Sequence, residues 1–291
     1  MKLEIKNQYV CLTVDTLGAQ MVSLKSADGT EYLWQGDPQY WDGQAPNLFP
    51  FIGRLYDGKC SYEGTQYPMG IHGFAAGQEF RVISRQEDQV VLELRDNEQT
   101  RKQYPVAFSY QIGYALKDSQ VIVTNRAENL DSKCMAFAVG GHPGFNVPIE
   151  KGESFEDYSL IFANPCVPTR IGFSDQVLVN GQQWVYRLKN DREIPLTHDV
   201  FDDDAIIIKD MDRKVSLCSR KSSRSVTVEY PDFPCLGFWH MPHMDAPYVC
   251  IEPWTSLPAR QDVVEELTQK SDMIHLNPGK TFVTHWTITI R

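Results

Sequence analysis

The sequence predicts an all-β fold, in which one large antiparallel sandwich spans residues 1–291 as a single domain with few short helices. Three observations lead to this prediction. Apolar and polar residues alternate with a period of two in many short segments, as half-buried strands require. Helical periodicity is nearly absent, and no repeated alternation of strand and helix indicates a parallel sheet. Turn-forming residues separate the segments.

The predicted strands are rich in β-branched and aromatic residues, which favour a pleated sheet. In chain order they cover residues 9–14, 79–84, 89–94, 108–114, 120–125, 205–208, 225–230 and 281–288, and residues 248–251 form a similar apolar run. Turns are expected at 26–29, 85–88 and 116–119, each of which contains an aspartate.

Two segments have a helical pattern instead. Residues 260–268 predict a helix of about two turns, and residues 97–102 predict a single turn. A Gly- and Pro-rich stretch at 140–152 could mark a domain boundary, but strands of the same kind stand on both sides of it. One sandwich is therefore favoured over two domains.

Charge and composition exclude several classes of function. The chain has 28 Lys and Arg against 38 Asp and Glu, a net charge of −10, which disfavours nucleic acid and anionic membranes. The N-terminus lacks a signal-peptide core, no apolar run reaches transmembrane length, and the seven scattered cysteines include no Cys-x-x-Cys pair. We expect a cytoplasmic protein, monomeric or homodimeric. Nucleotide-binding and α/β-hydrolase motifs are absent from the sequence.

Three segments depart from the strand pattern and place ionisable residues among Gly, Pro and aromatic residues. They cover residues 45–55 with 70–75, residues 138–148, and residues 249–254. His72 and His142 each stand beside a glycine, which lets backbone or ligand approach closely. Loops on a rigid sheet often carry function, although each histidine could equally be a turn residue with its side chain in water.

Glu252 follows the apolar run at 248–251 and precedes Pro253 and Trp254. A carboxylate at the end of a buried strand beside an aromatic ring loses solvation, which raises its pKa and makes it a better base near neutral pH. The alternative is a surface glutamate at the strand exit.

The remaining candidates are more ambiguous. Arg54 follows a glycine, and its planar guanidinium suits sugar hydroxyls or a carboxylate, unless it only forms a surface salt bridge. The run Asp202-Asp203-Asp204 lacks the spacing of a calcium loop. His240 and His243 form a His-x-x-His pair, but Pro242 interrupts any helix that would align them, so no metal site is expected. Trp239, Trp254 and Phe145 could stack on a sugar or belong to the core.

Taken in chain order, the motifs of these segments resemble those of the aldose 1-epimerase (galactose mutarotase) family, and in particular of its LacX-type branch. The residues that carry the resemblance are Asn47-Leu48-Phe49-Pro50, Gly53-Arg54-Leu55, His72-Gly73-Phe74, Gly141-His142-Pro143-Gly144-Phe145, the Asp run before Ala205, Ile251-Glu252-Pro253-Trp254, and Leu276-Asn277-Pro278-Gly279-Lys280. The resemblance extends from about residue 5 to the C-terminus.

The resemblance implies a large antiparallel β-supersandwich and an isomerase that interconverts the α and β anomers of a free hexose without metal or cofactor. It implies that Glu252 is the general base at the anomeric hydroxyl and that His142 is the general acid at the ring oxygen. His72 would hydrogen-bond near that oxygen, Arg54 would hold sugar hydroxyls, and Asp203 or Asp204 would bind a hydroxyl on the opposite side of the ring. From the sequence itself, and not from the resemblance, we expect Trp239 to face the sugar.

The sequence departs from the family pattern at two places. Gly140-Gly141 precedes His142 where typical members carry Asn, and Phe238-Trp239-His240 stands where a Gln is expected. The departures put galactose specificity in question. Two alternatives follow: a hexose-6-phosphate 1-epimerase, with Arg101, Lys102 or Arg170 holding the phosphate, or a non-catalytic carbohydrate-binding protein on the same fold.

Overall fold

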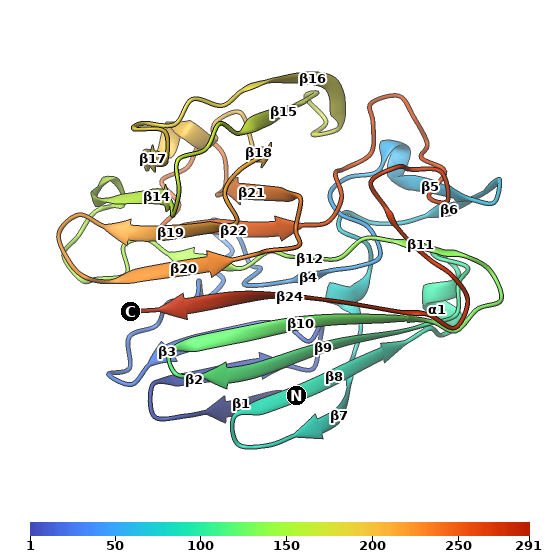
Figure 1. Ribbon diagram of the computed structural model, residues 1–291, viewed down its shortest axis with the longest axis horizontal. Coiled ribbons are helices and arrows are strands. Elements are labelled where there is room, and N and C mark those ends of the chain that lie inside the picture. The colour runs from blue at the N-terminus through green and yellow to red at the C-terminus, as the bar shows by residue number, and fades with distance from the viewer.

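The computed structural model describes residues 1–291 and is built almost entirely from antiparallel strands (Figure 1). The larger of its two main sheets has nine strands. In spatial order they are β17 (Glu193–Pro195), β14 (Tyr158–Phe162), β19 (Lys214–Ser219), β20 (Ser225–Glu229), β24 (Thr281–Ile290), β10 (Gln120–Asn129), β9 (Phe108–Lys117), β8 (Gln89–Arg95) and β7 (Arg81–Arg85).

The second main sheet has eight strands, several of them very short. In order they are β16 (Val179–Val185), β15 (Thr169–Phe173), β18 (Ile206–Lys209), β21 (Cys235–Trp239), β22 (Tyr248–Trp254), β12 (Gly140–Gly141) and β4 (Asn47–Leu48), with β13 (Gly144–Asn146) paired to β22. Because β22 lies inside this sheet, all seven of its residues are buried.

Smaller elements complete the fold. One sheet joins β1 (Lys2–Lys6), β2 (Val10–Asp15) and β3 (Met21–Ser26), and two strand pairs join β5 (Lys59–Tyr62) to β6 (Thr65–Pro68) and β11 (Met135–Phe137) to β23 (Ile274–Leu276). The one α-helix is α1 (Glu98–Arg101), and four 3-10 turns cover Tyr56–Gly58, Ala75–Gly77, Phe155–Asp157 and His198–Phe201. No helix is long and apolar enough to cross a membrane.

The structure confirms the all-β antiparallel prediction, and every predicted strand overlaps an observed one. The alternation behind the prediction is visible in β10, where buried and partly exposed residues alternate along much of the strand. The predicted turns at 26–29, 85–88 and 116–119 lie where β3, β7 and β9 end.

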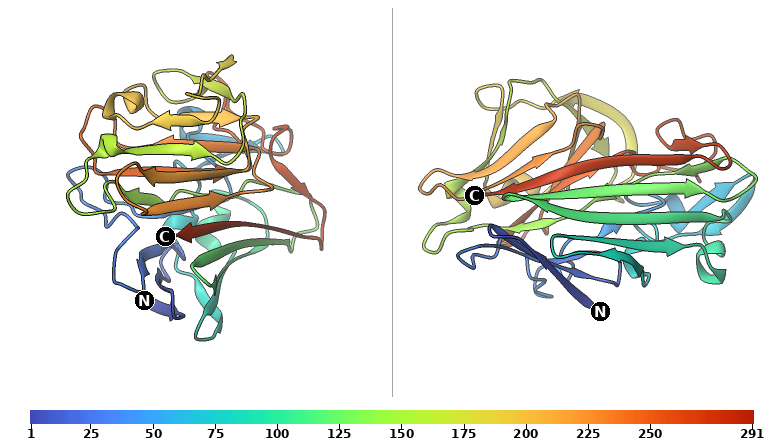
Figure 2. Two further views of the ribbon diagram at one scale, coloured as in Figure 1. Left: turned by 60° about the vertical axis from the view of Figure 1, so that its left-hand side comes forward. Right: turned by 60° about the horizontal axis from the view of Figure 1, so that its bottom comes forward.

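One hydrophobic core of 75 buried residues connects the sheets. β24 pairs with β20 on one side and with β10 on the other, so the nine-stranded sheet joins residues from both halves of the chain. Figure 2 shows β24, in red, running alongside the green strands β9 and β10. We infer that residues 1–291 form a single domain, because no division of the sequence separates this sheet and core into two units.

The helix predicted for residues 260–268 is wrong. This segment forms bridges and turns, and Asp262 has a φ of 61°. The buried carboxylate of Glu265 accepts hydrogen bonds from the backbone N–H and the guanidinium of Arg260, and the backbone around it pairs with Ser61 of β5. These contacts satisfy the polar groups that a helix would have paired locally. The turn predicted at 97–102 is confirmed as α1, which Asn97 caps.

Candidate active site

A cavity of about 340 Å³ opens over the middle of the eight-stranded sheet. Seven of the residues singled out in the sequence line it: Arg54, His72, His142, Asp204, Trp239, Glu252 and Trp254. They come from widely separated parts of the chain, and the short strands β4 and β12 beside the central strand β22 bring them together. Asp203, by contrast, is exposed and lines an adjoining cavity.

Glu252 lies within β22 and not at the end of a strand, because pairing with β21 continues to Trp254. Its side chain is only 1% exposed, so the surface alternative is wrong. Gly237 stands opposite Glu252 in the neighbouring strand, and a Cβ there would lie 3.3 Å from the Glu252 Cβ. The missing side chain at 237 leaves room for the carboxylate.

His142 directly follows β12, and its backbone N–H donates to the carbonyl of Pro46. Gly141 packs against the ring of Trp286 in β24, where a Cβ would come within 2.6 Å of the indole. A larger residue at 141, such as the Asn typical of the family, would displace either the indole or the strand that carries His142. The departure noted in the sequence therefore has a packing reason.

The imidazole of His142 and the carboxylate of Glu252 face each other, with Nε2 and Oε2 3.3 Å apart. Burial raises the pKa of Glu252 well above its usual value; the Trp254 indole N–H opposes this shift and the Asp204 carboxylate adds to it. Burial also lowers the pKa of His142 to about 4. Both shifts favour the uncharged form of each residue, so a single proton held by the pair rests on Glu252 and leaves His142 neutral.

His72 approaches His142 from the loop after β6, with its ring centroid 5.4 Å from that of His142. Its Nδ1 accepts a hydrogen bond from the backbone N–H of Gly53, which leaves the proton on Nε2. Burial lowers the pKa of His72 well below its usual value, and the charges of His142 and Arg54 add to this shift. Gly73 follows with a φ of 78° and packs against the backbone of Phe49, where no Cβ would fit.

Arg54 and Asp204 present charged groups to the cavity. The Arg54 side chain is exposed, forms no salt bridge with any carboxylate, and is the only lysine or arginine in the cavity lining. Asp204 has a φ of 68°, and its Oδ1 accepts the backbone N–H of Ala205, so its second oxygen remains available. Between Asp203 and Asp204, the structure thus places Asp204 in the cavity.

Aromatic rings form one wall. Trp239 lies 5.6 Å from His142 and 5.5 Å from Trp41, measured between ring centroids. Sequence reasoning missed Trp41, which also lines the cavity; the only available signal was an aromatic residue in an irregular segment between Gly36 and Gly43. Trp254 lines the cavity as well, whereas Phe145 is fully buried and does not.

Three buried polar atoms of the cavity region have no hydrogen-bond partner within the protein: His142 Nδ1, Glu252 Oε2 and Trp254 Nε1. Buried polar groups are nearly always paired, since leaving one unpaired costs about 1–3 kcal/mol. Their concentration around one cavity indicates that a polar ligand completes the site.

The remaining candidates lie elsewhere or form other contacts. His240 is buried and contacts His198 and the Met241 carbonyl, whereas His243 is exposed and pairs with Asp202, so the two do not share a metal position. His142, Cys250 and Glu252 have potential ligand atoms within 4.8 Å of one another. Burial raises the pKa of the Cys250 thiol well above its usual value.

None of the cations considered for phosphate binding lines this cavity. Arg101 pairs with Asp96 beside α1, where Lys102 also lies, and Arg170 lines the adjoining cavity. In Figure 1, α1 lies at the opposite edge of the molecule from the β14–β17 end.

The family model described as aldose 1-epimerase matches residues 1–289 of this chain. The protein LacX (plasmid) of Lactococcus lactis subsp. lactis is 33% identical over 299 residues, an alignment that covers 100% of this chain and 99% of the relative.

Solved structures show the same similarity. A galactose mutarotase related enzyme from Lactobacillus acidophilus has a TM-score of 0.95 at 35% identity, covering 100% of this chain and 97% of its own. A galactose mutarotase-like protein from Lactobacillus casei has a TM-score of 0.93 at 30% identity, with both chains covered fully. A putative aldose 1-epimerase from Escherichia coli K12, at 15% identity and a TM-score of 0.79, shares the fold.

Proposed function

Because this chain belongs to the aldose 1-epimerase family, we propose that it interconverts the α and β anomers of a free hexose, with no metal or cofactor. The observation that carries the proposal is the buried pair of His142 and Glu252, whose Nε2 and Oε2 lie 3.3 Å apart beside a cavity with unpartnered polar atoms. Ring opening needs a base at O1 and an acid at O5 at the same time, and this pair supplies both.

In the reactive state the proton of the pair has moved from Glu252 to His142, which leaves the carboxylate free to accept a proton. The Glu252 carboxylate takes the proton from the O1 hydroxyl while His142 donates its proton to O5. The C1–O5 bond breaks and C1–O1 becomes a carbonyl. After rotation about C1–C2, O5 attacks the other face of C1, Glu252 returns a proton to O1, and His142 recovers the O5 proton. The pair holds one proton throughout, so each turnover regenerates it without exchange with bulk water.

Other residues of the site bind the sugar and stabilise the charge that develops during the reaction. His72, neutral and protonated on Nε2, donates a hydrogen bond near O5, where charge develops as the ring opens. Arg54 and Asp204 hold sugar hydroxyls, and Trp239 with Trp41 provides apolar faces for the C–H side of the ring.

The cavity favours a free hexose over a hexose 6-phosphate. Arg54 is the only lysine or arginine that lines it, and the carboxylates of Asp204 and Glu252 lie in the same wall. A non-catalytic carbohydrate-binding protein would gain nothing from a buried carboxylate left without a hydrogen bond, because such a group lowers stability. Calorimetric sugar binding without any rate enhancement would instead support that alternative.

Polarimetry of freshly dissolved α-glucose and α-galactose tests the proposal. The expected result is a protein-dependent acceleration of the approach to the equilibrium rotation, proportional to enzyme concentration, for at least one sugar. Glucose 6-phosphate serves as the comparison substrate and should be accelerated less. Rates equal to the buffer blank for every free hexose would reject the proposal, and acceleration of the phosphate alone would favour the phosphate epimerase.

A further inference from the structure

Two loops beside the candidate active site are joined by histidines that the proposed mechanism does not use. The first loop covers residues 198–204, and the second covers residues 239–243. Their backbones are not paired, because the ladder between β18 and β21 ends at Ile206 opposite Phe238. Asp204 lies two residues beyond that end, yet it lines the cavity. Side chains must therefore hold this part of the site in place.

The inner contact between the loops is a hydrogen bond of 3.2 Å between His198 Nδ1 and His240 Nε2. His240 is fully buried, and its Nδ1 lies 2.8 Å from the carbonyl oxygen of Met241. A carbonyl only accepts, so Nδ1 of His240 carries the proton, its Nε2 is the acceptor, and His198 is the donor. Burial also lowers the pKa of His240 to about 4, which keeps that ring neutral and preserves this direction of hydrogen bonding.

The first loop links this hydrogen bond to Asp204. His198 begins the 3-10 turn His198–Phe201, and Phe201 packs on the His240 ring with 4.4 Å between ring centroids. The carbonyl of Phe201 accepts the backbone N–H of Asp204 at 3.0 Å. Asp204 has a φ of 68°, a conformation that a residue other than glycine keeps only where its surroundings hold it. The contacts from His240 through Phe201 to Asp204 provide that support.

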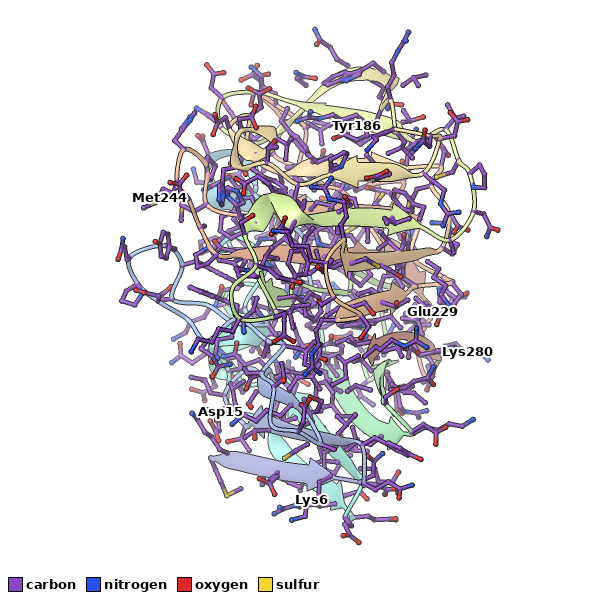
Figure 3. All side chains as sticks on the ribbon, turned by 90° about the vertical axis from the view of Figure 1, so that its left-hand side faces the viewer. Lys6, Asp15, Tyr186, Glu229, Met244 and Lys280 are labelled. Atoms are coloured by element: carbon purple, nitrogen blue, oxygen red, sulfur yellow. The ribbon has the colours of Figure 1, made fainter.

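The outer contact between the loops lies at the surface. Asp202 Oδ1 accepts the backbone N–H of His243 at 3.1 Å and lies 3.2 Å from its Nδ1. The two side chains are 42% and 76% exposed, so water competes for both of them. Figure 3 shows Met244, the residue after His243, near the edge of the molecule. The buried pair of His198 and His240 is thus the main connection between the loops.

We propose that His198 and His240 are positioning residues, whose hydrogen bond holds Asp204 in the cavity where it binds the sugar. The inference rests on the proposed function, in which the Asp204 carboxylate accepts a hydrogen bond from a sugar hydroxyl. It also gives the His-x-x-His pair of His240 and His243 a role without a metal, since both histidines connect the second loop to the first. Neither His198 nor His240 lines the cavity, so their loss acts on KM and not on kcat.

Two variants of His198 separate its hydrogen bond from its packing, because His198 also stacks on Phe155 with 4.0 Å between ring centroids. His198→Phe keeps an aromatic ring but has no donor, and it is expected to raise KM for a free hexose about three- to tenfold while kcat stays within about twofold. His198→Asn places an amide N–H where Nδ1 stood, and it should keep KM within about twofold of the wild type.

His243→Ala is the matched control at the exposed contact and should change KM by less than about twofold. All rates are measured by polarimetry. A larger rise in KM for His198→Asn than for His198→Phe would overturn the inference, because the ring stack and not the hydrogen bond would then hold the loop. A rise in KM for His243→Ala as large as for His198→Phe would also overturn it.

A double-mutant cycle tests whether the effect passes through Asp204. Asp204→Gly removes the carboxylate, and glycine adopts the positive φ without strain. In this background His198→Phe should raise KM by less than about twofold, since no carboxylate remains to be positioned. An undiminished effect of His198→Phe would show that the histidine acts by another route and would overturn the inference.

Amide hydrogen exchange without sugar separates the inference from the proposed function. In His198→Phe, fragments that cover residues 198–205 should exchange about three- to tenfold faster than in the wild type, whereas β20 should be unchanged. If His198→Phe fails to fold, His198→Ala replaces it with the same expectations. Equal exchange in variant and wild type would overturn the inference. Failure of the wild type to accelerate any sugar would reject the proposed function, while the exchange rates would still decide whether the histidines hold the loop of Asp204.

Discussion

Each main sheet buries a glutamate on a strand, and the two glutamates have opposite surroundings. Glu93, on β8 of the nine-stranded sheet, accepts hydrogen bonds from Ser109, Gln111 and Arg81 and is 5% exposed. Burial alone would raise its pKa, but these hydrogen bonds lower it to about 2. Glu252, on β22 of the eight-stranded sheet, has a carboxylate oxygen, Oε2, without a hydrogen-bond partner, and its pKa is raised.

The comparison shows that burial alone does not give a carboxylate its role. A buried carboxylate with a full set of donors is permanently charged and stabilises the fold. One without donors exchanges its proton readily with a neighbour and is available for chemistry. Glu93 thus stabilises the nine-stranded sheet, whereas Glu252 of the eight-stranded sheet presents an unpaired oxygen where the cavity opens.

Replacement of the Glu252 carboxylate is expected to have the largest effect on activity. Glu252→Gln should lower kcat for hexose mutarotation by about 10²- to 10⁴-fold, because the amide cannot accept the O1 proton. Its melting temperature should equal or exceed that of the wild type, since Gln carries no buried charge. Polarimetry and thermal melting check both parts. A variant with near wild-type turnover would contradict the role assigned to Glu252.

A fall in pH is also expected to inactivate the pair of His142 and Glu252. Below pH about 4, His142 takes a second proton, and the shared proton then stays on Glu252, which can no longer act as a base. The enzyme-catalysed kcat/KM, corrected for the buffer rate, should therefore fall about tenfold per pH unit below that value. Circular dichroism at each pH controls for unfolding. An acid limb centred near 6.5 would indicate a histidine with an ordinary pKa.

The paired carboxylate should show the converse behaviour. Glu93→Gln should lower the free energy of unfolding by about 1–3 kcal/mol, because its hydrogen bonds lose their charge, and leave kcat within about twofold. Since the folded-state pKa of Glu93 is depressed, its contribution is present above the ordinary value of 4.5 and lost as pH falls towards about 2. Urea denaturation across this range should show a weaker pH dependence in the variant. A loss of activity without a loss of stability would break the comparison.

Asp204 is intermediate between Glu93 and Glu252 in its hydrogen bonding. One of its oxygens accepts the backbone N–H of Ala205, and the residue lines the cavity. Asp204→Asn is expected to raise KM about three- to tenfold with little change in kcat, which corresponds to one weakened hydrogen bond. Asp203→Asn, in the exposed neighbouring position, should change the KM for a free hexose less than twofold. The reverse ranking would move the sugar-binding role back to Asp203.

The strands could be predicted because their pattern is local. Alternation in segments such as 120–125 reflects which face of the strand meets the core, and a single strand contains that information. The segment 260–268 shows the limit, since its apolar spacing fits a helix. Buried hydrogen bonds of Glu265 and contacts with Ser61, far away in the sequence, override that preference.

The site could be anticipated only in part. The sequence predicts Glu252 as a base at the end of a strand, because Pro253 follows it, but the strand continues to Trp254. The positive φ of Asp204 determines that Asp204, and not Asp203, enters the cavity. The sequence gives no sign of this φ, because the neighbouring residues are also aspartates. Trp41 lies in an irregular segment without periodicity, so only the three-dimensional arrangement brings it to His142.

The central position of β24 has a consequence for biosynthesis. The nine-stranded sheet consists of β17, β14, β19 and β20 on one side of β24 and β10, β9, β8 and β7 on the other, and Trp286 of β24 packs beneath Gly141, next to His142. A nascent chain that has not yet released residues 281–290 from the ribosome holds two four-stranded pieces with unpaired edges, and Gly141 lacks its packing against Trp286. These edges need protection from other chains during synthesis, and the surroundings of His142 are complete only when the last strand has been released.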